Sequence, residues 1–197
     1  MQSVIQAIRD RRSHKAFTSR PVGEQDIRTM LEAAVLAPNH KMTQPWTFAV
    51  LGRIARRKYG EIRAQLKFNA LGATSQDLNI PVDKAVLDEK RDKMIAETAA
   101  IPAVVVVLQK LEGDAHRKRE DYAAVFMAIE NLLLVATSMG YGSKVHTGDI
   151  LNAVPMRELV KAEETEQIVA IIHIGEPAEE PKPKPRIPAA DKTRWIP

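Results

Sequence analysis

The chain has 197 residues, with 29 lysines and arginines against 25 aspartates and glutamates, five histidines and no cysteine. The absence of cysteine excludes disulfides, thiolate metal sites and a cysteine nucleophile, and it fits a reducing cytoplasm as the expected location. The net charge of +4 is interspersed, and no aromatic residues alternate with a basic run, so we expect no nucleic-acid partner. No continuous apolar run is long enough to span a bilayer, so we expect no membrane partner either.

Hydrophobic spacing and helix breakers predict the elements of the first half. A short helix is expected over residues 3–12 and a second over 24–37, which Pro38 ends. The segments that follow are predicted as a strand over 46–51, a helix over 54–70, a loop-like stretch over 72–81 and a charged helix over 82–100.

In the second half, residues 103–108 are apolar on both faces, which predicts a buried central strand. A long core helix is expected over 122–139, and it closes at Gly140-Tyr141-Gly142 because glycine often follows a helix C-terminus. Residues 155–161 predict another helix, and 167–174 predict a second buried strand. This order of elements favours a central sheet flanked by helices.

The C-terminal tail has a different composition. Its many prolines predict an extended segment, and it ends in Trp195-Ile196, which would be costly to leave in water. We therefore expect the tail to pack along a surface, such as that of another subunit. On this basis the chain divides into a domain over residues 1–175 and an extended arm over residues 176–197.

A basic segment follows the first predicted helix. Arg11, Arg12, Ser13 and Lys15 lie within five positions. Guanidinium groups match phosphate oxygens in pairs, and a lysine adds a point charge, so the segment suits a phosphate. The ordinary alternative is a solvated basic helix end, which the helix dipole favours.

Two further segments carry polar groups at element ends. Residues 39–44 include His40 and Gln44, which suit the carbonyls and ring nitrogens of a heterocycle, and the alternative is a hydrogen-bonded turn beside a packed Trp46. Residues 140–148 follow a helix and lack the third glycine, so they are no dinucleotide fingerprint. They could still place His146 and Thr147 against a flat ring, and the alternative is a glycine cap followed by a turn.

The chain offers no conventional catalytic machinery. No two histidines stand at metal-ligand spacing on one helix, and neither a nucleophile elbow nor a P-loop is present. We therefore expect no metal site and no catalytic nucleophile. His173 alternates within a predicted buried strand, which favours a hydrogen-bonded core or interface histidine.

Taken in their order, these segments resemble the nitroreductase family of FMN-dependent oxidoreductases. The family's Arg-Arg-Ser-x-Arg element corresponds to residues 11–15, and its proline and Gln-Pro-Trp correspond to Pro38 and residues 44–46. Its Gly-x-Gly turn after a long central helix corresponds to residues 140–142, and its final Gly-x-Pro to residues 175–177. The resemblance covers nearly the whole chain.

The resemblance implies an α+β fold with a central, mostly antiparallel sheet, and a homodimer that exchanges its C-terminal arms and binds FMN at the interface. Lys15 stands where arginine is more common, which keeps the charge but loses the two-pronged fork. Met42 stands where many members have an asparagine that contacts the flavin ring, so the ring contacts are expected to differ. The residues implied to bind FMN are Arg11, Arg12, Ser13, Lys15, His40, Gln44, Val145, His146, Thr147 and Arg186.

The implied activity is a ping-pong reaction. FMN takes hydride from NADH or NADPH and passes electrons to a small-molecule acceptor such as a nitroaromatic, a quinone or a similar conjugated compound. Three alternatives stay open: a related flavoenzyme that removes halogens, oxidises rings or fragments flavin; a flavin-binding sensor without turnover; and a basic binding module. Residues 67–97, expected to cover the active site, carry no motif that identifies the acceptor.

Overall fold

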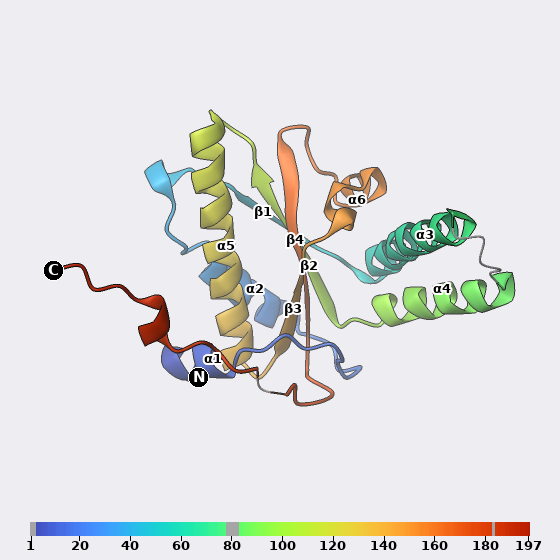
Figure 1. Ribbon diagram of the computed structural model, residues 1–197, viewed down its shortest axis with the longest axis horizontal. Helices are drawn as coiled ribbons and strands as arrows, with labels where there is room; N and C mark the ends of the chain where they lie inside the picture. Colours follow the sequence, from blue (N-terminus) through green and yellow to red (C-terminus); the bar gives the residue numbers. More distant parts are fainter. Residues whose placement is uncertain (1–2, 78–82, 183) are drawn as a thin grey trace.

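The computed structural model describes residues 3–77, 83–182 and 184–197, and its centre is a four-stranded sheet (Figure 1). The strands lie in the order β1-β2-β4-β3, and each neighbouring pair is antiparallel, which confirms the predicted sheet. Their bounds are Trp46–Val50 for β1, Ala103–Lys110 for β2, Gly142–His146 for β3 and Glu166–Gly175 for β4.

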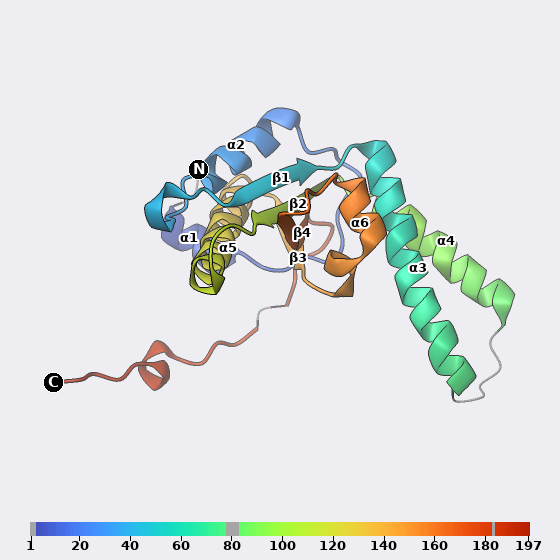
Figure 2. The same ribbon diagram turned by 90° about the horizontal axis from the view of Figure 1, so that it is seen from above.

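Helices cover both faces of this sheet (Figures 1 and 2). Helices α1, α2 and α5 lie on one side, α3 and α6 lie on the other, and α4 packs against α3. The fold is therefore α+β, as predicted. The helix bounds are Val4–Asp10 (α1), Glu24–Ala34 (α2), Arg53–Asp77 (α3), Lys84–Ala99 (α4), Ala115–Ser138 (α5) and Val154–Leu159 (α6).

The two central strands separate two hydrophobic clusters. Val105 and Val107 of β2 pack in the cluster under α2 and α5, whereas Val104 and Val106 pack in the cluster under α3 and α6. All four side chains are fully buried, because successive residues of a strand point to opposite faces and both faces are covered. This explains the continuous apolar run from which the strand was predicted.

Several predicted bounds were wrong. Helix α2 ends at Ala34 rather than at residue 37, and α3 continues to Asp77, so the first part of the expected 72–81 loop is helical. The rest of that loop, and the expected helix start at residue 82, involve positions 78–82, which lie outside the described residues. Helix α5 begins at Ala115 rather than at residue 122, because the side chain of Asp114 caps it by accepting from the backbone N–H of Arg117 at 2.9 Å.

Helix α5 is the core helix that the sequence predicts, and Gly140 follows its end with φ 85°. By length and composition α5 is apolar enough to cross a membrane. The side chains of its inner face, such as Val125, Ile129 and Leu132, are instead buried against the sheet and α2, whereas Tyr122 and Met127 are exposed. Such burial is the arrangement of a core helix in a globular domain.

Beyond β4 the chain first stays on the domain and then leaves it. The backbone N–H of Thr18 donates to the carbonyl of Glu176 at 2.9 Å, and Phe17 forms an isolated bridge with Pro177. From there the C-terminal segment extends away from the body in both views (Figures 1 and 2). The side chain of Trp195 is 90% exposed, so the described residues of one chain do not provide the surface on which it was expected to pack.

Candidate functional site

The two arginines of the first segment lie against helices of their own chain. The Nη1 of Arg12 donates to the carbonyl oxygens of Arg9 at 2.5 Å and Arg11 at 2.8 Å, which caps the C-terminal end of α1. The Nε of Arg11 lies 3.5 Å from a carboxylate oxygen of Glu130 on α5. For Arg12 the structure therefore has the geometry of the ordinary alternative, a helix cap.

The same segment then runs alongside β3. Ser13 forms an isolated parallel β-bridge with Ser143, and the backbone N–H of His14 donates to the carbonyl of Ser143 at 2.9 Å. The ring of His14 packs so closely on Gly142 that a Cβ there would lie 2.7 Å from the Cγ of His14. This contact explains the glycine, and it brings the first and third predicted segments together.

A group of three cations forms where these segments meet. Lys144 of β3 lies near Arg63 of α3 and Lys15, and its pKa is lowered by burial and then by the repulsion of these two charges. Within the described parts of the chain, none of the three pairs with a carboxylate. An unbalanced positive cluster of this kind is a site for an anion.

Arg63 is held in place by two contacts on its own side of the sheet. Its Nη1 donates to the hydroxyl of Thr98 on α4 at 2.8 Å, and its guanidinium carbon lies 5.5 Å from the centre of the Tyr59 ring. Both contacts leave its charge uncompensated, because neither partner is anionic.

Three further side chains form a hydrogen-bond chain on the same side, and two of them, Tyr59 and His173, are buried. The hydroxyl of Tyr59 lies 3.0 Å from the Nε2 of His173, and the Nδ1 of His173 lies 3.2 Å from the Nε2 of His146. Burial, followed by the neighbouring positive charges, lowers the pKa of His146 to about 4, and burial lowers that of His173 to about 2. Both imidazoles are therefore neutral at pH 7. His173 is the hydrogen-bonded core histidine that the sequence predicts.

His146 and Thr147 line a cavity of about 370 Å³ at the end of β3. Cationic side chains come from α3, and apolar side chains come from both sides of the cavity. The volume suits a small aromatic ligand. Its lining residues are Arg63, Leu66, Lys67, Met94, His146, Thr147, Gly148, Asp149 and Ile150.

Val145 does not share this environment. It is the neighbour of His146 in β3, so its side chain points to the opposite face, where it packs on the cluster under α5. Of the three predicted residues at the end of β3, the structure brings His146 and Thr147 together at the cavity. The side chain of Val145 lies on the other face of the sheet, under α5.

The second predicted segment lies elsewhere in the single chain. The Nδ1 of His40 lies 3.1 Å from a carboxylate oxygen of Glu120, near the start of α5, whereas Arg11 contacts Glu130. The two glutamates are ten positions apart, which corresponds to about 15 Å along the helix. Arg186 is exposed on the arm, so the structure does not bring it to the other predicted residues either.

The turn that carries this second segment is strained. Lys41 and Met42 both have φ 53°, and Gln44 has φ 43°, a region that non-glycine residues seldom occupy. The side-chain oxygen of Asn39 holds the turn by accepting from the backbone N–H of Gln44 at 2.9 Å, beside a buried Trp46. Such strain is concentrated at functional sites, and here it leaves the side chains of Met42 and Gln44 exposed.

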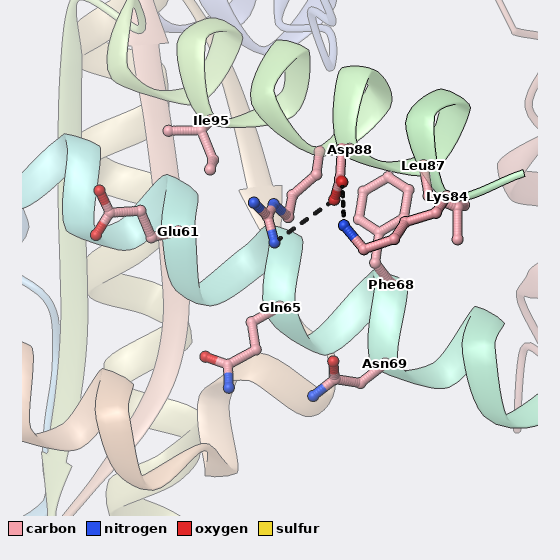
Figure 3. A pocket seen from close by; sticks show the side chains of 9 residues that line it. Glu61, Gln65, Phe68, Asn69, Lys84, Leu87, Asp88 and Ile95 are labelled. Atoms are coloured by element: carbon pink, nitrogen blue, oxygen red, sulfur yellow. Dashed lines mark hydrogen bonds and ion pairs between the residues drawn. The ribbon is translucent and has the colours of Figure 1, made fainter.

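A larger cavity, of about 600 Å³, lies between α3 and α4 (Figure 3). Its charges compensate one another, because Asp88 lies 2.7 Å from the ammonium of Lys84 and 3.9 Å from the guanidinium of Arg91. None of the predicted site residues lines it. We therefore take the smaller cavity beside the unpaired cations as the candidate site.

Sequence reasoning missed four residues of this arrangement. Lys144 had a usable signal: if residues 142–146 are read as a strand, Lys144 and His146 share one face. Tyr59 and Arg63 lie on a helix far away in sequence and carry no local signal, and His173 was recognised only as a core residue.

The chain combines a four-stranded antiparallel sheet between helical layers with an uncompensated cationic site at one sheet edge. Its sequence matches the Nitroreductase family over residues 8–176. The chain therefore belongs to the nitroreductase family, a family of oxidoreductases, as the motifs predict.

Individual relatives agree with this assignment. The protein YfhC of Bacillus subtilis (strain 168) is 29% identical, and the alignment covers 94% of this chain and 90% of YfhC. The nitroreductase-like family protein of Bacillus cereus superposes with a TM-score of 0.79 at 24% identity, covering 100% of this chain and 97% of that one. The NADPH:FMN oxidoreductase of Vibrio harveyi, solved with NAD+, superposes with a TM-score of 0.74 at 18% identity, covering 98% and 76%. At such identities the two structures support the fold alone.

Proposed function

We propose that the protein is an FMN-dependent oxidoreductase that takes hydride from NADH or NADPH and reduces small conjugated acceptors, such as nitroaromatics or quinones, by a ping-pong mechanism. The observation that carries the proposal is the cluster of Lys15, Arg63 and Lys144, which lacks a carboxylate partner among the described residues. The name of the Vibrio harveyi relative, which includes both FMN and NADPH, supports the choice of cofactor and donor.

The residues present fit FMN. The flavin carries an anionic phosphate, and its ring becomes anionic on reduction, so it requires cations that are free to pair. Lys144 meets this requirement, because an anion would relieve the repulsion that lowers its pKa. The cavity beside it offers neutral His146 as a polar group and the apolar side chains of Leu66 and Met94 as surfaces for a ring.

When bound, FMN would supply the hydride acceptor and the electrons for the second substrate. The chain supplies binding, orientation and electrostatics. Lys15, Arg63 and Lys144 hold negative charge at the edge of the sheet. Lys67 and Met94, which belong to the 67–97 region, line the cavity, and this supports the proposal that the region borders the candidate site.

We also propose a homodimer, in which residues 1–175 form the FMN-binding domain and residues 176–197 pack on the partner. Val4, Ile5 and Ile8 expose an apolar face on α1, and Trp195 and Ile196 are exposed on the arm. Exposed apolar surface of this extent marks an interaction site. A second copy would also supply the strained turn at His40 and Gln44, which lies apart from the other predicted residues in one chain.

Steady-state kinetics test the reaction order. With NADH or NADPH and menadione varied in turn, double-reciprocal plots are expected to give parallel lines, because the donor leaves the site before the acceptor enters. The purified protein should be yellow and should bleach under anaerobic conditions when the donor is added. Intersecting lines would exclude the ping-pong order, and a colourless protein that takes up no FMN would return the interpretation to a binding module.

Replacing Lys144 by methionine is expected to weaken FMN binding about ten- to hundredfold, the range for one hydrogen bond to a charged group. The variant keeps most of the side-chain volume and removes a charge that has no carboxylate partner among the described residues, so the fold should persist. Quenching of flavin fluorescence measures the dissociation constant. Lys90→Met, at an exposed position on α4, is the matched control, and equal affinities of the two variants would remove Lys144 from the site.

A further inference from the structure

The hydrogen-bond chain of Tyr59, His173 and His146 has only one arrangement of protons that satisfies its buried end. Tyr59 is fully buried, and in the described structure the only hydrogen-bond partner of its hydroxyl is the Nε2 of His173 at 3.0 Å. A buried hydroxyl proton without an acceptor is costly, so the Tyr59 hydroxyl donates and the Nε2 of His173 accepts. Burial raises the pKa of Tyr59 to about 12, which keeps this proton in place.

The second step follows from the neutrality of His173. A neutral imidazole carries one proton, and with its Nε2 accepting, that proton is on Nδ1. The Nδ1 of His173 lies 3.2 Å from the Nε2 of His146, so His173 donates and His146 accepts. His146 is neutral as well, because burial and the charges of Lys144 and Arg63 disfavour a second proton. Its own proton is therefore on Nδ1.

The His146 end of this hydrogen-bond chain lies at the cavity. His146 is one of the residues that line the 370 Å³ cavity, and no hydrogen bond to its Nδ1 is formed by the described residues. The Nδ1–H group is thus an unused donor beside Arg63 and Lys67, which have no acceptor lone pairs to offer. The lining therefore combines these donors and cations with the carboxylate of Asp149, and next to the donors it suits a ligand edge that carries acceptor atoms.

We propose that Tyr59 and His173 are positioning residues that hold His146 in its Nδ1–H tautomer, as a hydrogen-bond donor to a carbonyl oxygen or ring nitrogen of a planar ligand in this cavity. The proposal rests on the proposed function, because it takes that ligand from the flavin reaction. The FMN ring and the conjugated electron acceptor are planar molecules of that reaction that carry such atoms. Their shared chemistry is an acceptor-bearing edge of an aromatic or quinonoid ring.

The tautomers can be observed directly. Long-range ¹H–¹⁵N correlation spectra of the ¹⁵N-labelled protein at pH 7, with and without added FMN, are expected to show both His146 and His173 protonated at Nδ1. In Tyr59→Phe the Nε2 of His173 loses its donor, and the two histidines are expected to populate Nε2–H. Tyr122→Phe is the matched control, because the Tyr122 side chain is partly exposed on α5 and its hydroxyl forms no hydrogen bond among the described residues. Nε2–H tautomers in the unsubstituted protein would overturn the proposal.

Binding measurements identify the ligand that His146 contacts. If FMN is that ligand, Tyr59→Phe and His146→Ala weaken FMN binding about three- to tenfold, the range for one neutral hydrogen bond, and His146→Asn, which keeps an N–H donor, restores part of the loss. If the electron acceptor is the ligand, the KM for menadione rises by that factor while the dissociation constant of FMN stays unchanged. His146 is partly exposed, so its variants remain informative even if Tyr59→Phe does not fold.

An unchanged FMN dissociation constant together with an unchanged KM in the His146 variants would overturn the proposal. The two proposals also fail separately. An unsubstituted protein that takes up no FMN contradicts the proposed function, whereas Nε2–H tautomers contradict the hydrogen-bond chain whether or not FMN binds.

Discussion

Removing residues 183–197 is expected to turn the protein into a monomer and to abolish most of its FMN binding. The segment carries Ile187, Trp195 and Ile196, which are 62%, 90% and 83% exposed in the single chain. Burial of each large apolar side chain contributes about 1.5–3 kcal/mol, so the three together strengthen association by at least about a thousandfold. Without the arm, the two halves of the proposed site no longer stay together.

Analytical ultracentrifugation measures the change in mass, and flavin fluorescence measures the change in FMN affinity at the same protein concentration. Residues 184–197 are exposed and do not pack in the domain, so circular dichroism of the truncated chain should show an unchanged fold. A variant with Trp195→Ala and Ile196→Ala should weaken the dimer, whereas Thr193→Ala with Arg194→Ala, at neighbouring exposed positions, should not. A truncated chain that stays dimeric and keeps its FMN affinity would refute the exchanged arm.

The sequence predicts both central strands and also the edge strand β1, whose apolar residues are only partly buried. Residues 103–108 and 167–174 are continuous apolar runs because helices cover both sides of the sheet. The edge strand β3 was missed, since its residues 142–146 alternate between an apolar layer and a polar site and so match neither a core strand nor a clean amphipathic one. The start of α5 was missed because its first turns are charged and only the capping Asp114 marks them.

Residue type and position did not predict the site's geometry. Arg11 and Arg12 are neighbours of identical chemistry, yet one guanidinium contacts Glu130 and the other binds carbonyls of its own helix end. The contact between Tyr59 and His173 joins residues 114 positions apart, and it exists only because α3 packs over β4. Patterns in one sequence encode local structure, whereas this site depends on how the layers meet.

Lowering the pH from 7 to 5 is expected to reduce the free energy of unfolding by about 2 kcal/mol for the buried His173, and by less for the partly exposed His146, because solvent screens its interactions. Their folded-state pKa values, about 4 and about 2, lie below the unfolded value of about 6.5, so the unfolded chain binds more protons in this range. The stability that the two neutral imidazoles contribute is fully present above about pH 6.5 and is lost as the pH falls toward their folded-state pKa values. The cause is burial beside Lys144 and Arg63, which disfavours the imidazolium.

Urea unfolding at pH 7, 6 and 5, at one fixed protein concentration, measures this loss. His146→Gln removes one of the two titrating groups and should lower the loss between pH 7 and 5. His116→Gln is the matched control, because it removes a histidine whose side chain is 78% exposed. If stability stayed constant from pH 7 to 5, or if both variants lost it equally, the buried imidazoles would not be the neutral, desolvated pair on which the tautomer of His146 depends.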